Sequence, residues 1–321
     1  MKTLANTLIA GALALSVTSV AAQEKVMIGE PSWPGAKIMA NIIGQVIEGR
    51  LGGEVGYAPG ANAIIFEAMD GGRGDIDVHP DVWLPNQSSF TDKYVDGAGT
   101  VSLSKGAYEG RSGFCTPNYM VEKHSIKSVF DLATPEAQAL FDTNNDGMGE
   151  IWVGASGWAS TNVHSVKARD YGIETFLEPT TEDEAVFYAR LKDAIANEEG
   201  VVFYCYKPHY VHALYNVTIL EEPEFDPALY KIVTPDADAD WYNKSSIMTG
   251  DQVKTVRVAH ANTLSTRNPA AASFLSSIDM SADELSALTY EVVVKGQEIE
   301  TVVAAWIEAN GDMVDGWLGL N

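Results

Sequence analysis

The alternation of short apolar runs with amphipathic helical stretches is the sequence feature that most restricts how this chain can fold. Residues 25–30 (KVMIGE) have the length and composition of a strand, and residues 36–52 place Ile38, Ile42 and Val46 on one helix face. The segments EVGYAP, NAIIFEAMDG and DIDVHP repeat the order as strand, helix and strand. This order predicts an α/β fold with a mostly parallel sheet flanked by helices.

The same order returns in a second part of the chain. EIWVGA and VVFYCY have the composition of strands, and residues 161–171 and 182–197 have helical spacing. A chain of about 300 residues is more than one compact core usually holds. We therefore expect two lobes joined by strands that cross between them, which makes the first lobe discontinuous. The expected boundaries are residues 23–116 and 216–321 for lobe 1 and residues 117–215 for lobe 2.

The C-terminal part is expected to be helical. Ser281 and Glu284 have the spacing of a capping box at a helix start. Trp306 and Trp317 stand among apolar residues at helical spacing, so we expect their rings to pack in the core rather than to bind a ligand.

The first 22 residues have the composition of a secretory signal peptide. Lys2 precedes an apolar stretch, and small residues stand ahead of an expected cleavage site after Ala22. The remaining chain is therefore expected to be soluble and periplasmic. Cys115 and Cys205 would then lie in an oxidising compartment, where they form either a disulfide or two buried free thiols.

The acidic composition and the histidine spacing exclude some functions. The formal net charge is -23, which argues against nucleic acid and anionic membranes as partners, because phosphate binding needs basic patches. A cationic or zwitterionic ligand is compatible with it, although an acidic surface also serves solubility alone. None of the six histidines forms an H-E-x-x-H pattern, and no G-x-S-x-G pattern is present. A secreted hydrolase is therefore the remote alternative to a binding protein.

Aromatic residues recur just after predicted strands. Trp33, Trp83 and Trp158 each follow one, and Tyr206 and Tyr210 follow VVFYC. Ligands of open α/β sheets bind outside the carboxyl ends of strands, so these rings are expected to meet at one site, two loops from each lobe. Several aromatic faces together attract a quaternary ammonium group. The alternative is that each ring caps the core of its own lobe.

The choice between ligand binding and capping of the core matters most for the segment HPDVWLPNQ, because two prolines flank Trp83. Proline lacks a backbone N–H and fixes its own φ, so we expect a rigid loop here rather than an interior strand. The loop would hold the indole as one wall of a preformed box.

These segments resemble a known family. SWPGAKIMANIIGQVIE, GDIDVHPDVWLPNQ, the pair Gly157-Trp158 and YKPHY are similar to the periplasmic substrate-binding proteins of ABC transporters for glycine betaine, proline betaine and choline-like compounds. The resemblance implies a type II periplasmic binding protein, monomeric, that delivers a small zwitterionic or cationic methylated amine to an ABC permease in the inner membrane. It also implies that Trp33, Trp83 and Trp158 form an aromatic cage. Tyr206 stands where many relatives have Trp, and Tyr210 could contribute instead.

A separate acidic segment has the spacing of half a calcium loop. In FDTNNDGMGEI, Asp142, Asn144 and Asp146 alternate and a glycine follows. Such spacing gathers side-chain oxygens around a turn, with the carbonyl of Met148 and the side chain of Glu150 available to complete the shell. We expect structural Ca²⁺ here; the alternative is an Asx-rich turn without metal.

The calcium-type loop together with the betaine scaffold resembles the trimethylamine N-oxide binding proteins of marine bacteria. In those relatives four tryptophans box the methyl groups and a glutamate meets the oxide oxygen. The candidates for that glutamate here are Glu109 and Glu30, with Glu122 behind them. A carboxylate-bearing betaine would instead need donors such as Ser156, Ser160, Thr161 or His209. Glycine betaine, choline, carnitine and dimethylsulfoniopropionate remain alternative ligands.

Overall fold

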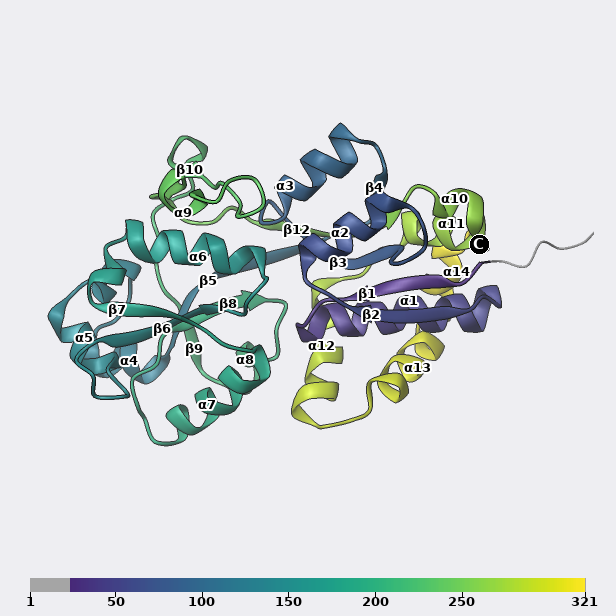
Figure 1. Ribbon diagram of the computed structural model, residues 1–321. Coiled ribbons are helices and arrows are strands. Elements are labelled where there is room, and N and C mark those ends of the chain that lie inside the picture. The colour runs from purple at the N-terminus through teal and green to yellow at the C-terminus, as the bar shows by residue number, and fades with distance from the viewer. Residues whose placement is uncertain (1–23, 321) are drawn as a thin grey trace, which may run out of the picture.

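The computed structural model describes residues 24–320, and the predicted signal peptide lies outside this range. Two α/β lobes lie side by side and are joined by strands (Figure 1). The first lobe contains β1 (Val26–Glu30), α1 (Pro34–Leu51), β2 (Val55–Pro59), α2 (Asn62–Gly71), β3 (Val78–Leu84), α3 (Ser88–Thr91), β4 (Val101–Leu103), α10 (Leu264–Arg267), α11 (Pro269–Ser277), α12 (Ala282–Thr289), α13 (Ile299–Ala309) and α14 (Gly311–Trp317). The second contains α4 (Asn118–His124), α5 (Pro135–Phe141), β6 (Gly149–Gly154), α6 (Ala159–Asp170), β7 (Leu177–Thr181), α7 (Glu184–Ala196), β8 (Phe203–Lys207), α8 (Val211–Leu214) and β9 (Val217–Ile219).

Two long strands connect the lobes, β5 (Tyr108–Pro117) and β12 (Lys254–Ala261). The sheet order is β2-β1-β3-β12-β5-β8-β6-β7, with β1 parallel to β2 and β3, and β6 parallel to β7 and β8. The first residues of β5 pair with β12 and the next ones with β8, so a single strand belongs to the sheets of both lobes. The predicted α/β class with mostly parallel pairing and crossing strands is confirmed.

Helix α1 supports the first lobe and begins at the expected site. Pro34 occupies its first position, where a missing N–H is harmless, and Trp33 is its N-cap. The helix ends where Gly52 adopts a left-handed conformation with φ 66°, which glycine tolerates without strain. Its apolar face, including Ile38, Ile42 and Val46, is buried in the main core.

The expectation of a rigid loop around Trp83 was wrong, because Trp83 lies in β3, an interior strand between β1 and β12. Pro80 is tolerated there for two local reasons. The pairing of β3 with β1 is confined to Val78, and the register with β12 shifts between Arg257 and Ala259, opposite the proline. Its missing N–H therefore removes no ladder bond.

Residues 217–250 pack on the second lobe. β9 pairs with the end of β5, and the segment containing β10 (Tyr230–Lys231), α9 (Trp241–Lys244) and β11 (Ser246–Ile247) packs against α6. The predicted boundary at residue 216 assigned this segment to lobe 1, whereas in the structure it packs on the second lobe. The chain returns to the first lobe with β12. Sequence spacing did not distinguish this excursion from the C-terminal helices of lobe 1.

Several local predictions can be followed in the structure. Cys115 on β5 and Cys205 on β8 form a disulfide with an S–S distance of 1.99 Å. The capping box of α12 is present, with reciprocal bonds between Ser281 and Glu284. The rings of Trp306 and Trp317 stack at 5.9 Å near the C-terminus.

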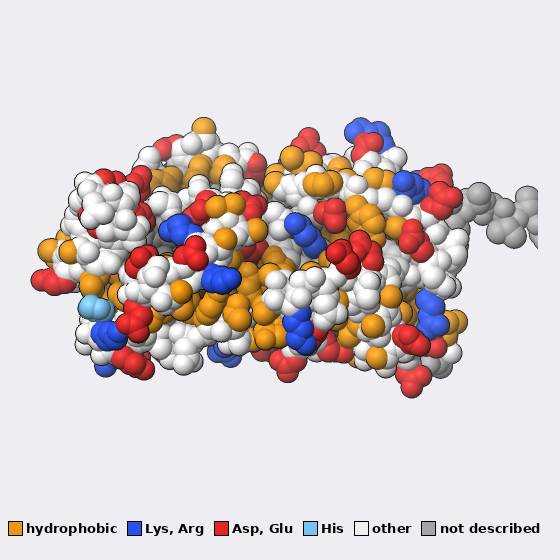
Figure 2. All heavy atoms as spheres, turned by 90° about the horizontal axis from the view of Figure 1, so that it is seen from below, with side chains coloured by type: hydrophobic (Ala, Val, Ile, Leu, Met, Phe, Trp, Pro, Cys, Tyr) orange, Lys and Arg blue, Asp and Glu red, His pale blue; other side chains and the backbone are white. Residues whose placement is uncertain are grey.

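The surface carries many acidic side chains, and Figure 2 shows apolar side chains gathered where the two lobes meet on one face. Within the part of the chain that the structure describes, no helix combines the length and apolar character needed to cross a bilayer.

Candidate functional site

An aromatic cavity lies between the two lobes. Trp33 and Trp83 come from the first lobe, while Trp158 and Tyr206 come from the second. The rings stand nearly perpendicular to their neighbours, with Trp33 and Trp158 at 5.8 Å and 82° and Trp83 and Tyr206 at 5.5 Å and 83°. We refer to this space as the aromatic cavity; its lining is Trp33, Asn62, Trp83, Asn86, Gln87, Trp158, Ala159, Ser160, Tyr204 and Tyr206.

Tight turns bring the indoles to this place. Trp33 and Trp158 are the N-cap residues of α1 and α6, each just after the carboxyl end of a strand. Gly154 and Gly157 precede Trp158 with φ 126° and 83°. At Gly154 a Cβ atom would lie 2.4 Å from Thr161 Oγ1, so only glycine fits this turn.

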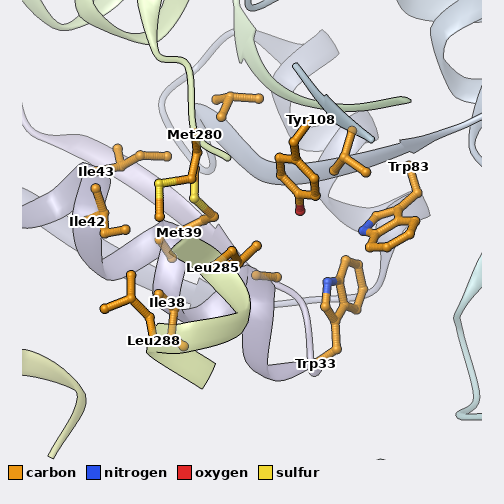
Figure 3. Close-up of a cluster of buried hydrophobic side chains, with 14 of the residues drawn as sticks. Trp33, Ile38, Met39, Ile42, Ile43, Trp83, Tyr108, Met280, Leu285 and Leu288 are labelled. Carbon is orange, nitrogen blue, oxygen red and sulfur yellow. The ribbon is translucent and has the colours of Figure 1, made fainter. Parts of the chain in front are cut away.

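A buried carboxylate holds the two first-lobe indoles. Asp81 Oδ2 accepts a hydrogen bond from Trp33 Nε1 and another, of 2.9 Å, from Trp83 Nε1. Asp81 Oδ1 accepts from the Tyr108 hydroxyl. Figure 3 shows both indole nitrogens and the Tyr108 hydroxyl turned toward a common point. Burial raises the pKa of Asp81, although its three donors oppose that effect.

The neighbouring histidine adds no positive charge. Burial lowers the pKa of His79 to about 3, so its ring is neutral near pH 7. The backbone N–H of Asp81 donates to His79 Nδ1 at 3.2 Å, and His79 Nε2 lies 2.9 Å from Asn62 Oδ1. Because Nδ1 accepts, the single ring proton sits on Nε2 and is donated to Asn62.

The second-lobe wall is also supported from behind. The Tyr206 hydroxyl donates to Glu184 Oε1 at 2.8 Å, and His209 Nε2 lies 3.2 Å from the same oxygen. Burial raises the pKa of Tyr206 well above its usual value, so the phenol stays protonated. Tyr204 stacks beside Tyr206 with centroids 5.7 Å apart and faces Trp158 at 6.2 Å.

Uncharged polar groups line the rest of the cavity. Asn86 and Gln87 are 6% and 2% exposed, and their side-chain oxygens Oδ1 and Oε1 have no hydrogen-bond partner among the described residues. Amide oxygen and nitrogen can exchange places by a flip, so each side chain can present an acceptor or a donor. Ser160 adds a hydroxyl from the start of α6.

The predicted ligand-binding residues divide into two groups. Trp33, Trp83, Trp158, Tyr206 and Ser160 line the cavity. His209 instead stacks on Tyr188 behind the second-lobe wall, and the Tyr210 ring lies 5.5 Å from Tyr188 at a tilt of 54°. None of the three acidic candidates lines the cavity. Glu109 is exposed on β5, and Glu30 borders an adjoining space with Ser32 and Lys37; Glu122 is exposed on α4.

Sequence reasoning missed Tyr204, Asn62, Asn86, Gln87 and the role of Asp81. A signal existed for two of them: Tyr204 lies two residues before Tyr206, and Asp81 two before Trp83, so each pair shares one face of a strand. Asn86 and Gln87 come just after β3 and Asn62 begins α2, but nothing local marks the orientation of these amides.

The acidic loop before β6 gathers oxygen atoms. Carboxylate oxygens of Asp142, Asp146 and Glu150 lie within 4.8 Å of one another. Asp142 Oδ2 accepts from the Gly147 N–H at 3.0 Å, and Glu150 Oε2 accepts from the Thr143 N–H at 3.0 Å. Glu150 Oε1 is buried without a partner among the described residues. The donor set fits a hard cation such as Ca²⁺.

Two α/β lobes with an aromatic cavity between them have the architecture of a two-lobed solute-binding protein. Residues 24–309 match the family described as the substrate-binding domain of the ABC-type glycine betaine transport system. The chain belongs to this family. The predictions of a betaine-type periplasmic binding fold and of a non-enzymatic protein are thereby confirmed.

Relatives and solved structures are distant in sequence. The chain is 23% identical over 216 residues to the glycine betaine-binding periplasmic protein OusX of Dickeya dadantii, covering 64% of this chain and 63% of that relative. The match thus spans less than two thirds of the relative. The structure of the glycine betaine and proline binding protein ProX from Borrelia burgdorferi has a TM-score of 0.72 at 19% identity, with 92% of this chain and 96% of that one covered. A choline binding protein in complex with choline has a TM-score of 0.71 at 18% identity, with 92% and 91% covered.

Proposed function

We propose that this chain is the extracytoplasmic binding protein of an ABC transporter and captures a small methylated amine, cationic or zwitterionic, in the aromatic cavity. The single observation that carries the proposal is the arrangement of four aromatic rings from both lobes around one cavity, with a buried carboxylate behind two of them. Export by the signal peptide and delivery to an inner-membrane permease are parts of the same proposal.

The chemistry of the cavity suits an onium head group. Aromatic faces are partly negative, and each desolvated contact with a cation contributes roughly 0.5 to 2 kcal/mol. A trimethylammonium group carries no N–H, so it needs no hydrogen-bond acceptor, and removing its weakly bound water costs little free energy. Sodium would have to shed water that the rings cannot replace. The cavity therefore favours methylated nitrogen over small inorganic ions.

Binding is coupled to closure of the lobes. The first lobe presents Trp33 and Trp83, and the second completes the box with Trp158 and Tyr206. A ligand that touches both walls stabilises the closed form, because the open form offers it only half of the contacts. The permease would recognise the closed form.

Within this class we propose trimethylamine N-oxide as the preferred ligand, with glycine betaine, choline, carnitine and dimethylsulfoniopropionate as alternatives. The polar groups next to the rings are Asn86, Gln87 and Ser160, which are uncharged. Flipped amides and a hydroxyl can donate to a single compact oxide oxygen. A betaine carboxylate is larger and has no basic partner in the lining.

Calorimetric titration of the purified protein with these five compounds tests the proposal. We expect at least one methylated compound to bind with a dissociation constant in the micromolar range or below, and ammonium and sodium chloride to give no saturable heat. Trp158→Ala is expected to abolish the signal while the protein stays folded. Absence of binding for all five compounds would contradict the proposed function.

We also propose that the loop containing Asp142, Asn144 and Asp146 holds structural Ca²⁺, with Glu150 and the carbonyl of Met148 completing the shell. The clustered oxygens and the partnerless Glu150 Oε1 support it. A bound cation would offset the repulsion between the three carboxylates and fix the entry to β6. The loop precedes β6 and Trp158 follows it, so the metal would not touch the ligand.

A further inference from the structure

Asp81 is a buried carboxylate without a countercharge. It is 1% exposed, and among residues 24–320 it forms no ion pair with a lysine, arginine or histidine. Its carboxylate accepts hydrogen bonds from the two indole N–H groups and the Tyr108 hydroxyl, and its backbone N–H donates to the neutral ring of His79. An unpaired charge in a protein interior is unfavourable, so a buried carboxylate in this setting normally has a paired cation.

Asp81 lies directly behind the aromatic cavity, so an onium group bound there would be the cation that it lacks. Trp33 and Trp83 form the first-lobe wall, and both point their Nε1 atoms away from the other lobe to the same oxygen of Asp81. Each indole thus lies between the carboxylate and the space where an onium group would bind. An indole that donates to an anion has a more electron-rich face, and the low dielectric of the interior preserves the attraction.

We propose that Asp81 determines the charge selectivity of the aromatic cavity. Its carboxylate acts as the countercharge for the onium group, through the two indoles that it orients, and makes the cavity bind an onium group more tightly than an uncharged molecule of the same shape. This inference rests on the proposed function and adds the residue that sets its specificity. Asp81 is a positioning residue, because the indoles separate it from the ligand.

Asparagine at this position removes the charge and keeps the geometry. Oδ1 of asparagine can replace the oxygen that accepts from both indoles. Its Nδ2 group then faces the Tyr108 oxygen, and the hydroxyl can rotate to accept the hydrogen bond instead of donating it. All three contacts therefore have a counterpart in the Asp81→Asn variant. Tyr108→Phe is the matched control, because it removes one of the three bonds and leaves the charge.

The experiment compares choline with its uncharged carbon isostere 3,3-dimethylbutan-1-ol, by calorimetry and by competition, in the parent and both variants. We expect Asp81→Asn to weaken choline binding at least tenfold and to change the affinity for the isostere less than twofold. Tyr108→Phe should change the two affinities by the same factor. The same comparison with trimethylamine N-oxide and tert-butanol covers the N-oxide case.

The outcomes separate the two proposals. Equal losses for the charged and uncharged compounds in Asp81→Asn would mean a structural role for Asp81 and would overturn the inference while the proposed function stands. An unchanged choline affinity would also overturn it. A parent protein that binds none of the onium compounds would overturn the proposed function, and the charge selectivity with it. Unfolding midpoints of all three proteins, measured without ligand, exclude a general loss of folding.

Discussion

Trp158 Nε1 donates a hydrogen bond of 2.9 Å to Ser32 Oγ and thereby joins the two lobes beside the aromatic cavity. Ser32 immediately precedes Trp33, whose ring lies 5.8 Å from that of Trp158. The same pair of loops therefore supplies both a wall of the cavity and a bond that exists only when the lobes meet. Closure and ligand contact are linked by neighbouring residues.

Ser32→Ala should weaken ligand binding without damaging the fold. The change removes one hydrogen bond of the closed form, which contributes about 0.5 to 1.5 kcal/mol, so we expect a loss of affinity of roughly 2- to 12-fold. Calorimetric titration measures it. Ser156→Ala is the control. Ser156 lies in the second-lobe loop across the adjoining space from Ser32, and its replacement should change affinity less than twofold. An affinity of Ser32→Ala equal to that of the parent would show that the bond does not support closure.

Replacement of the two tryptophans Trp83 and Trp306 should separate binding from stability. Trp83→Ala removes a wall of the cavity and is expected to lower affinity at least tenfold. Trp306 stacks on Trp317, far from the cavity in the chain, so Trp306→Ala should reduce the free energy of unfolding by about 1 to 3 kcal/mol. The folded fraction of that variant should bind normally. Titration and urea unfolding of both variants test this contrast, and the reverse pattern would contradict it.

The fold was predictable where the residues of one short segment by themselves determine its secondary structure. The apolar spacing of residues 36–52 indicated α1, and the Ser281 and Glu284 spacing indicated the start of α12. The strand character of Trp83 was not predictable, because Pro80 is tolerated only through the limited pairing of β3 with β1 and the shift on β12. Those features depend on strands distant in sequence.

The sequence predicted where the site residues lie relative to the strands, but not which of them contact one another. Trp33 and Trp158 each follow a strand and Trp83 lies near the end of one, which local sequence indicates. Asp81 and Trp33 are 48 residues apart, and their hydrogen bond depends on how β3 and α1 meet. The orientation of Asn86 and Gln87 likewise follows from the packing of both lobes. Charge in a buried position cannot be recognised before the fold around it is known.

Removal of calcium should destabilise the protein and leave ligand binding intact. Without the cation the carboxylates of Asp142, Asp146 and Glu150 repel one another, so a chelator is expected to lower the unfolding midpoint by several degrees. Ligand affinity should change less than twofold, because β6 separates the loop from Trp158. Scanning calorimetry with excess calcium and with chelator measures the shift.

The variant Asp146→Asn provides the control for the calcium site. It removes one charged ligand, so its midpoint in calcium should fall toward that of the chelated parent and the chelator should add little. An identical midpoint for the parent in calcium and in chelator would remove the metal assignment and leave the loop as an Asx-rich turn. That turn is already formed by bonds such as the one from the Met148 N–H to Asp146 Oδ1 at 2.9 Å.

A buried group of charges connects α6 with the start of β12. Lys167 Nζ lies 2.8 Å from both Glu222 Oε1 and Asp251 Oδ1, and Lys254 Nζ lies 3.0 Å from Asp251 Oδ2. Ser112 on β5 donates to Asp251 at 2.6 Å. Burial by itself would raise the pKa of Asp251, but the two lysines outweigh it and hold this pKa well below its usual range.

Acid should therefore remove the stabilising effect of Asp251. Because its folded pKa is lower than the unfolded value of about 3.9, its contribution is fully present above that value and is lost as pH falls toward the folded pKa. Asp251→Asn leaves two buried lysines short of a partner and is expected to cost about 3 to 5 kcal/mol at pH 7. The difference in unfolding free energy between parent and variant should shrink between pH 5 and pH 2, in urea titrations at each pH. A difference that stays constant over this range would mean that the pKa of Asp251 is the same in the folded and the unfolded protein.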